Sequence, residues 1–282
     1  MNQRGSSGAR VVIDAAEVRK YGDIRVHQQG AWLRRHADIP CLPIVHAYTT
    51  HTVHRSGLYS YNMETLYPVD VSPDDGGTSA LLDRVSDVAY RHLWSRPAEC
   101  SLININAHIG WREQNLALAT NRHRRVLDAV CRSIRWGALQ RGLTHGDLII
   151  DNVLQRADGQ LVFIDPIPAT PALPDVPVSD IGRLVQSAVN YEWARYDGGA
   201  ELSYADVLLP LRTRYPDIIR DANDITATLY LAAVHALRGC RTAPDDATRA
   251  LIYRTCVTRI MEELITWMPW FSLEDGAHDS AN

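Results

Sequence analysis

The sequence lacks the features that mark membrane proteins, disulfide-bonded secreted proteins and zinc proteins. No apolar run approaches the roughly 20 residues that a membrane-spanning helix needs. The first eight residues lack the apolar core of a signal peptide. The five cysteines are scattered, and none form a Cys-x-x-Cys pair, which argues against a disulfide framework or a zinc site. We therefore expect a cytoplasmic protein that does not bind membranes.

Neither sign of charge dominates the chain. Lysine and arginine together number 29 and aspartate and glutamate 33, for a formal net charge of −4. This balance gives no electrostatic reason to expect a nucleic-acid partner. With 282 residues, 46% of them hydrophobic, the chain is long enough for one two-lobed enzyme or two small domains. The sequence does not determine the oligomeric state.

One short stretch carries most of the chemical information. It reads His-Gly-Asp-Leu-Ile-Ile-Asp-Asn over 145–152 and Phe-Ile-Asp-Pro over 163–166. Asp147 is suited to orient an acceptor hydroxyl, whereas Asn152 and Asp165 supply the hard oxygen ligands that Mg²⁺ prefers. In phosphoryl transfer the metal bridges the phosphates of a nucleotide and neutralises the charge that develops on the transferred group. A carboxylate binds Mg²⁺ better than a neutral carbonyl, so we expect Asp165 to be the principal metal ligand.

A predicted hairpin explains how the two metal ligands meet. The segments 153–156 and 160–164 have the composition of strands, and the Asp-Gly pair at 158–159 is typical of a tight turn. Folding the hairpin returns the end of its second strand to the start of the first. Asn152 and Asp165 are then expected to be neighbours in space.

This stretch resembles the catalytic segment of the aminoglycoside phosphotransferase and choline kinase family, which has the protein-kinase-like fold. The shared pattern is His-Gly-Asp, four residues, Asn, a hairpin and a hydrophobic residue before Asp. The resemblance implies an α+β fold, with a small antiparallel β-rich N-lobe over 1–66 and a larger, mostly helical C-lobe over 67–282. It also implies an ATP- and Mg²⁺-dependent enzyme that moves the γ-phosphate to a hydroxyl of a small molecule, such as a sugar or an aminocyclitol. GTP in place of ATP is left open.

The resemblance assigns roles around the catalytic loop. Asp147 orients the acceptor hydroxyl and takes its proton late in the transfer. His145 holds the loop by hydrogen bonds, and Asp180, at the start of the next helix, braces it. Asp151 is left open between a loop cap, which we favour, and a contact to substrate or metal.

The N-lobe is expected to contain the lysine that pairs with the nucleotide phosphates. Lys20 alternates with Val18 in a predicted strand, which is where the family has this lysine. In the family the following helix commonly carries a glutamate partner, but residues 24–36 contain no acidic residue and offer only Gln28 and Gln29. A glutamine is able to hydrogen-bond the lysine without supplying a counter-charge. The sequence predicts these strands: 9–13, 17–21, 40–48 and 57–64.

A short segment at the end of the predicted N-lobe is similar to the hinge of family members. It reads Met-Glu-Thr-Leu over 63–66. In the family, the backbone after the acidic residue contacts the adenine edge. This implies nucleotide contacts at Glu64, Thr65 and Leu66, with a plain strand end as the equal alternative.

Acceptor contacts are expected from the helix that starts near Asp180. Its sequence is similar to phosphotransferase-like domains from bacterial surface-sugar biosynthesis. Gln186, Tyr191 and Glu192 have side chains able to hydrogen-bond a polyhydroxylated acceptor. An ordinary amphipathic helix accounts for these residues equally well.

Two other classes of function remain. A nucleotide-binding pseudokinase that regulates a partner protein is favoured by the missing helix glutamate and the short N-lobe. The presence of Asp147, Asn152 and Asp165 together argues against it. A protein kinase is disfavoured because Pro166 replaces the glycine of its Asp-Phe-Gly motif and because residues 166–179 are too short and proline-rich for an activation segment.

Overall fold

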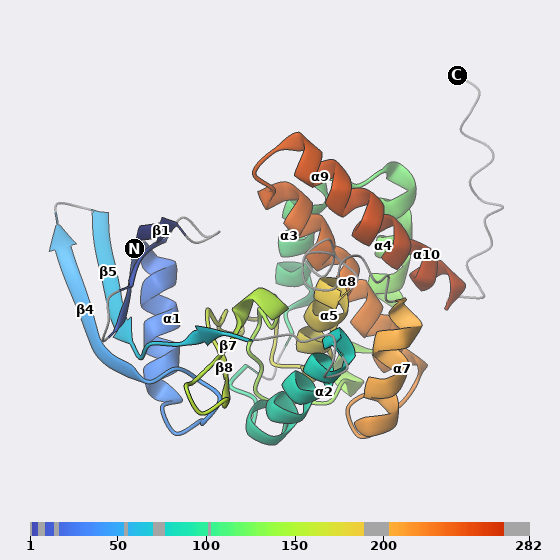
Figure 1. The fold of residues 1–282 in the computed structure, drawn as a ribbon. Helices are drawn as coiled ribbons and strands as arrows, with labels where there is room; N and C mark the ends of the chain where they lie inside the picture. Colours follow the sequence, from blue (N-terminus) through green and yellow to red (C-terminus); the bar gives the residue numbers. More distant parts are fainter. Residues whose placement is uncertain are drawn as a thin grey trace.

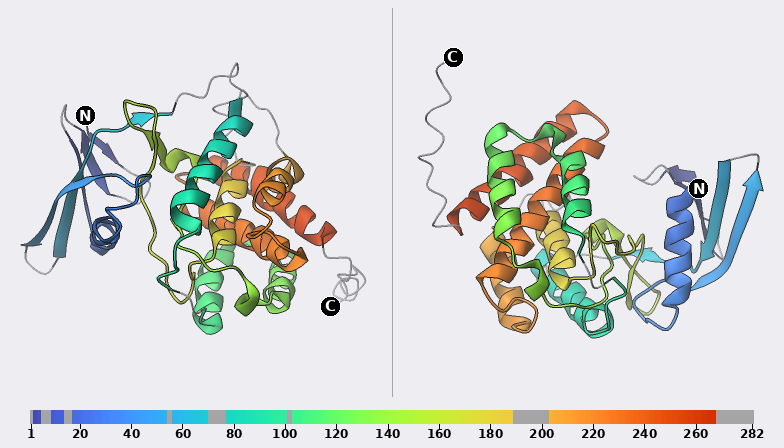
Figure 2. Two further views of the ribbon diagram at one scale, coloured as in Figure 1. Left: turned by 90° about the horizontal axis from the view of Figure 1, so that it is seen from below. Right: turned by 180° about the vertical axis from the view of Figure 1, so that it is seen from behind.

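The chain folds into two lobes of different composition. The computed structural model describes residues 2–4, 9–13, 17–53, 56–69, 77–100, 103–188 and 203–267. An antiparallel sheet with one helix forms the small lobe, and the larger lobe is mostly helical (Figure 1). Two further views show the same separation, with a short hairpin between the two parts (Figure 2). The predicted two-lobed α+β architecture is therefore confirmed.

The small lobe is built on a five-stranded antiparallel sheet in the order β1-β2-β3-β5-β4. Its strands are β1 (Asn2–Arg4), β2 (Arg10–Ile13), β3 (Val18–Gly22), β4 (Val45–Val53) and β5 (Ser56–Met63). The expected strand over 40–48 is wrong in its first half. Pro40 and Pro43 have no backbone N–H to donate to a strand partner, and Leu42 N closes a turn onto Ile39 O at 3.1 Å.

Helix α1 (Ile24–Arg35) covers one side of this sheet. Its N-cap is Asp23, whose side chain accepts a hydrogen bond from Arg25 N. Gly30 faces the sheet, and a Cβ there would lie 2.9 Å from the Tyr48 ring and 3.0 Å from the Tyr61 ring. The absence of a side chain at Gly30 therefore lets the helix approach β4 and β5 closely.

The predicted catalytic hairpin is confirmed. Strand β7 (Val153–Gln155) pairs antiparallel with β8 (Leu161–Phe163). Gly159 in the connecting turn has a φ of +84°, which glycine adopts without steric cost. The short strand β6 (Tyr67–Pro68) pairs with β7, so the chain leaving the small lobe joins the catalytic hairpin at once.

Helix α8 (Ala222–Thr242) is the core of the large lobe, and it is buried along most of its length. This burial agrees with its sequence, which is apolar on nearly all sides rather than along one stripe. Gly182 allows α5 to approach α8, because a Cβ at Gly182 would lie 2.9 Å from Thr228 O. Among the residues with assigned positions, no helix is both long and apolar enough to cross a membrane.

The other helices of the large lobe pack around α8 and along the connection from the small lobe (Figures 1 and 2). They are α2 (Gly77–Ala89), α3 (Ile105–Asn115), α4 (Asn121–Ser133), α5 (Pro177–Ala188), α7 (Tyr204–Arg214), α9 (Asp246–Ile252) and α10 (Thr258–Thr266). Shorter helical turns lie at Tyr90–Trp94, Leu116–Leu118, Trp136–Ala138, Ile150–Asn152 and Tyr253–Val257.

Arg156 ties the hinge to the hairpin. Its guanidinium donates to both carboxylate oxygens of Glu64, at 2.7 and 2.9 Å. The same group donates to the backbone oxygens of Pro40 (2.7 Å) and Leu42 (3.1 Å). One side chain from the hairpin therefore fixes two segments of the small lobe.

Three histidines are fully buried in the large lobe and kept neutral. His108 lies between the Ala172 carbonyl (2.8 Å from Nδ1) and the Tyr230 hydroxyl (2.9 Å from Nε2). Burial lowers the pKa of His108 and of His145 to about 4, from an ordinary 6.5. Burial, together with nearby guanidiniums, lowers the pKa of His235 well below 6.5.

The free energy of unfolding should fall as the pH drops below about 6.5. The unfolded chain then protonates all three histidines. In the folded chain His108 and His145 stay neutral down to about pH 4, and His235 stays neutral well below pH 6.5. Burial raises the pKa of Asp180 from 3.8 to about 6, so the folded chain takes up one proton in the same range. Near pH 5 the unfolded chain therefore binds about two more protons than the folded chain. The free energy of unfolding then changes by about 2.7 kcal/mol per pH unit.

Chemical denaturation between pH 7.5 and 4.5 measures this slope. His108→Gln should reduce the slope by about one proton, because it removes one of the three groups. Exposed His46 supplies the control, and His46→Gln should leave the slope as it is. A free energy of unfolding that does not change with pH over this range would contradict the assignment of neutral buried histidines.

Candidate active site

The catalytic loop is held by the buried carboxylate of Asp180, near the start of α5. This carboxylate accepts hydrogen bonds from His145 N (2.8 Å), Gly146 N (2.8 Å) and Trp94 Nε1 (3.1 Å). Asp180 therefore lies where the sequence placed a bracing residue. His145 itself is buried with its ring edge-on to Phe163.

A second buried carboxylate, that of Asp175, supports the residue that directly precedes the loop. Asp175 accepts from Thr144 N (3.1 Å) and Thr144 Oγ1 (2.8 Å). It also accepts from the backbone N–H groups of Glu99 (2.8 Å) and Cys100 (2.9 Å). Sequence reasoning missed Asp175; its one local signal is that it is the sole acidic residue of the proline-rich segment before α5.

Gly146 is required by the path of the loop. Its φ is +77°, and a Cβ there would lie 2.1 Å from Ile167 O. Ile167 cannot move away easily, because its backbone N–H donates to His145 O at 2.9 Å. The glycine of the His-Gly-Asp motif therefore has a steric and conformational reason to be there.

Asp147 lies in the loop with both carboxylate oxygens engaged. Its Oδ1 pairs with Arg183 Nη2 and lies 3.8 Å from Arg238 Nη1. Its Oδ2 accepts from Asn152 Nδ2 at 3.2 Å. Burial raises the pKa of Asp147, but the guanidiniums of Arg183 and Arg238 outweigh it and hold the pKa below the usual range. An ionised and weakly basic carboxylate is suited to orienting a hydroxyl and accepting its proton late.

Asn152 and Asp165 meet at the end of the hairpin. Ile164 N donates to Asn152 O at 2.9 Å, which links the two strand ends. The Asn152 side-chain nitrogen donates hydrogen bonds to the backbone oxygen and to the carboxylate of Asp147 (2.8 and 3.2 Å). The carbonyl oxygen of this amide is therefore the atom left for a metal.

Asp165 has a left-handed backbone. Its φ is +60°, the one positive φ among non-glycine residues in the described parts of the chain. Such a conformation costs free energy for most residues, and aspartate and asparagine tolerate it best. The Asp165 carboxylate is thereby fixed in direction at the junction of the lobes.

Lys20 reaches this carboxylate from the small lobe. Its Nζ lies 2.5 Å from Asp165 Oδ1 and donates to Gln29 Oε1 at 3.0 Å. The side chain is 2% exposed. Gln29 on α1 therefore contacts Lys20 without adding charge, and the charge of Lys20 is balanced by Asp165. Lys20 is also the only lysine in the sequence, a signal that the sequence analysis overlooked.

The donor set fits Mg²⁺ held together with a nucleotide. In the part of the chain that the structure describes, no three His, Cys, Asp or Glu side chains form a metal cage. Mg²⁺ usually takes only one or two protein ligands and completes its shell with phosphate oxygens and water. Asp165 and Asn152 suit that arrangement, and Lys20 is placed to contact the same phosphates.

The three residues of the expected hinge differ in the contacts that their side chains make. The Glu64 carboxylate is bound by Arg156 and also accepts from Ile44 N at 2.9 Å. The Glu64 side chain is therefore occupied by contacts within the protein. A nucleotide would be contacted by the backbone of residues 64–66. Thr65 Oγ1 is buried without a hydrogen-bond partner, and Leu66 is half-buried. The nucleotide contacts of Glu64, Thr65 and Leu66 stay a prediction.

The expected acceptor residues are only partly placed. Asp151 is exposed within the helical turn after the loop. Gln186 is buried, and its Oε1 accepts a hydrogen bond from Arg183 Nη1. Tyr191 and Glu192 lie outside the described residues.

Two arginines beside Asp147 were missed by sequence reasoning. Arg183 lies one turn after Asp180 and one turn before Gln186, so helical spacing alone places the three on one side of α5. Arg238 is on α8 and has no local sequence signal that connects it with Asp147. Both belong to the candidate site by distance.

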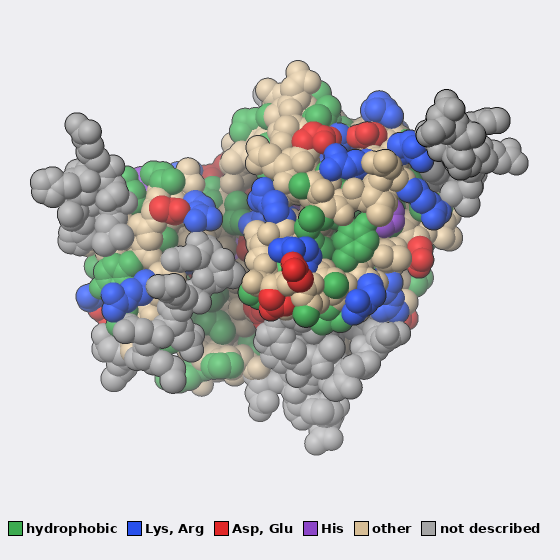
Figure 3. All heavy atoms as spheres, turned by 90° about the horizontal axis from the view of Figure 1, so that it is seen from above, with side chains coloured by type: hydrophobic (Ala, Val, Ile, Leu, Met, Phe, Trp, Pro, Cys, Tyr) green, Lys and Arg blue, Asp and Glu red, His purple; other side chains and the backbone are tan. Residues whose placement is uncertain are grey.

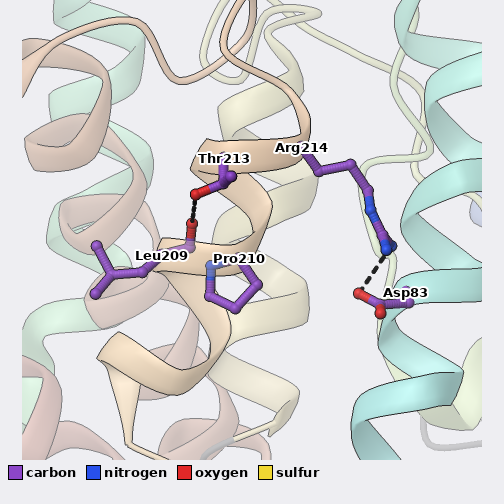
Figure 4. Close-up of a pocket in the computed structure, with 5 residues that line it drawn as sticks. All are labelled: Asp83, Leu209, Pro210, Thr213 and Arg214. Atoms are coloured by element: carbon purple, nitrogen blue, oxygen red, sulfur yellow. Dashed lines mark hydrogen bonds and ion pairs between the residues drawn. The ribbon is translucent and has the colours of Figure 1, made fainter.

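A surface hollow between α2 and α7 is not part of this site (Figure 4). Arg214 on α7 pairs with Asp83 on α2 at 2.8 Å, and Thr213 Oγ1 donates to Leu209 O at 3.0 Å. Pro210 completes the lining. These are contacts of a helix surface, and none of the predicted site residues takes part in them.

Gly146→Ala should lower the free energy of unfolding by about 2 kcal/mol or more, because it adds a clash to an unfavourable φ. Gly159→Ala, with a φ of +84° but open space around its Cβ position, should cost only about 1 kcal/mol. Gly137→Ala has no atom within 4 Å of the new Cβ and should cost nothing. Chemical denaturation gives the order, and equal losses at Gly146 and Gly159 would disprove the clash.

Comparisons with known proteins agree with this geometry at the level of the fold. No protein-family model matches the chain, and no curated protein matches it. Solved structures do match, at low identity. An aminoglycoside-3'-phosphotransferase of type VIII is 14% identical, with a TM-score of 0.57 over 82% of this chain and 91% of that chain. A microcompartment-associated aminopropanol kinase is 14% identical, with a TM-score of 0.58 over 92% and 89%.

A third structure was solved with ligands. It is a thermostable mutant of the aminoglycoside phosphotransferase APH(4)-Ia in a ternary complex with AMP-PNP and hygromycin B. It is 11% identical, with a TM-score of 0.56 over 95% of this chain and 94% of that chain. The chain therefore has the two-lobed, protein-kinase-like fold of these small-molecule kinases.

Proposed function

We propose that this protein is an ATP- and Mg²⁺-dependent phosphotransferase that moves the γ-phosphate of the nucleotide to a hydroxyl of a small molecule. The observation that carries the proposal is the junction of the lobes, where Lys20 contacts Asp165, Asn152 contacts Asp147, and the bond from Ile164 N to Asn152 O joins the two strand ends. The similar structures are described as kinases or phosphotransferases, and one holds AMP-PNP, which supports the same reading.

Each side chain has a separate part in the proposed reaction. Asp165 and the side-chain oxygen of Asn152 would hold Mg²⁺, which would neutralise charge on the phosphates. Lys20 binds the same phosphates and is kept in place by Gln29. Asp147 orients the acceptor hydroxyl and accepts its proton as the new bond forms, while Arg183 keeps the carboxylate ionised.

The rival hypothesis of a pseudokinase predicts nucleotide binding without turnover. Its main support in the sequence was the missing helix glutamate. That support is weaker in the structure, because Gln29 contacts Lys20 and Asp165 supplies the opposite charge. A non-catalytic module also has no chemical need for Asp147 in its braced loop.

Asp147→Asn should lower phosphoryl transfer by at least about 100-fold while Mg·ATP still binds, because it removes the proton acceptor and leaves the metal ligands. Asp165→Asn should abolish Mg²⁺-dependent transfer, and asparagine keeps the left-handed backbone at this position. ADP release over pooled hydroxyl compounds and the melting temperature with Mg·ATP measure the two effects.

Asp246→Asn is the matched control, because Asp246 is 93% exposed on α9 and should not affect either readout. Nucleotide-stabilised protein that releases no ADP with any pooled compound would favour the pseudokinase. Full activity in Asp165→Asn would refute the metal assignment. Loss of Mg·ATP binding in Asp147→Asn would show that the roles within the loop are divided differently.

Labelling of the single lysine tests the nucleotide site independently of turnover. An amine-reactive reagent has one side chain to modify, Lys20, besides the N-terminal amine. Labelling should be slow, because Lys20 is buried in an ion pair, and Mg·ATP should slow it further by at least about 10-fold. Peptide mass spectrometry gives the rate. Labelling that is unaffected by Mg·ATP would argue against phosphate contact at Lys20.

A further inference from the structure

We infer that the acceptor carries an anionic group, a phosphate or a carboxylate, and that Arg238 binds it. The inference rests on the proposed function and identifies the substrate class at the same site. It starts from an imbalance of charge at Asp147. Arg183 on α5 and Arg238 on α8 both approach the same oxygen, Oδ1. Two guanidiniums therefore face one carboxylate.

The two arginines are not equivalent. Arg183 is 10% exposed and pairs closely with Asp147. Its Nη1 also donates a hydrogen bond to the side-chain oxygen of Gln186. Arg238 is 30% exposed and lies 3.8 Å from Asp147 Oδ1, which is too long for a hydrogen bond. Within the residues that the structure describes, Arg238 has no other acidic partner. Arg183 thus positions Asp147, and Arg238 presents an uncommitted guanidinium beside it.

More positive charge lies around Arg238. Burial lowers the pKa of Arg238, and the charges of Arg183, Arg241 and Arg25 lower it further, whereas Asp147 raises it. Arg241 donates to the Gln114 backbone oxygen at 3.2 Å, a contact that leaves its charge unbalanced. Figure 3 shows arginine side chains, in blue, on the helical lobe where it borders the small lobe.

An unpaired donor at the same place points to a missing partner. Arg183 Nε is buried without a hydrogen bond. Buried donors without acceptors are rare in folded proteins. An acceptor oxygen of a ligand would satisfy this donor.

The sign of the charge excludes an amine as the main recognition element. A cationic acceptor would meet Arg238 and Arg241 with like charge. Among the described residues, the carboxylate that approaches Arg238 is that of Asp147, and it is already paired with Arg183. A phosphate or carboxylate would restore the balance. Guanidinium also binds both of these groups through two parallel hydrogen bonds.

The test compares acceptors that differ in charge but keep similar hydroxyl groups. The panel consists of gluconate, glucose 1-phosphate, glucose and glucosamine, together with wider pools of anionic, neutral and cationic hydroxyl compounds. With Mg·ATP present, ADP release and product mass give kcat and KM. We expect kcat/KM for anionic acceptors to exceed that for neutral and cationic ones by at least about 10-fold. The carboxylate and phosphate members separate the two possible anions.

Arg238→Gln should reduce the preference for anionic over neutral acceptors by about 10-fold, through a higher KM for the anion. The matched control is Arg132→Gln, because Arg132 is exposed on α4 and should leave the preference unchanged. Raising the salt concentration should increase the KM for the anionic acceptor in the wild-type protein and less in Arg238→Gln.

Three results would overturn the inference. They are a preference for neutral or cationic acceptors, transfer to none of the anionic compounds, and an Arg238→Gln variant that loses kcat equally on every acceptor. The last result would place Arg238 on the transferred phosphoryl group. Failure of the proposed function is distinct, because the protein would then neither bind Mg·ATP nor phosphorylate any member of any pool.

Discussion

The buried carboxylate of Asp180 is the contact on which the rest of the site depends. It gathers two consecutive backbone N–H groups of the catalytic loop and the indole of Trp94 onto the start of α5. The same helix carries Arg183 one turn later, and Arg183 sets the charge state of Asp147. Helix α5 therefore positions the loop and, together with Arg238 on α8, keeps the pKa of the Asp147 carboxyl low.

The nucleotide side is organised around an ion pair between the lobes. Lys20 comes from the centre of the small sheet and Asp165 from the end of the hairpin, and they meet at 2.5 Å. Gln29 orients the lysine without adding charge, so the whole counter-charge comes from a predicted metal ligand. A chain that otherwise uses arginine has a lysine at this one place; an ammonium is a compact point charge, whereas a guanidinium is a broad planar group.

Sequence-based predictions were accurate where the interacting residues are close along the chain, and less accurate where they are far apart. The hairpin and its turn were predicted correctly, because a tight turn and two short strands are encoded by neighbouring residues. The strand expected over 40–48 was wrong at its start, where prolines and a turn interrupt it. The contact between Lys20 and a glutamine was foreseen as an option, but its ion pair with Asp165 spans 145 positions and was not.

From the sequence alone, the resemblance of one motif to a family implied the fold class. The sequence also determined the cluster of Asp147, Asn152 and Asp165, because these residues lie within one short segment whose hairpin closes locally. Only the tertiary structure decided the charge around that cluster. Arg183 is 36 positions from Asp147, and Arg238 comes from a different helix that packs against α5. No local sequence spacing predicts that Arg183 and Arg238 both approach Asp147. Their proximity depends on the close packing of α5 against α8 at Gly182. The physical reason is that electrostatic environment depends on distance in space, whereas a motif records distance along the chain.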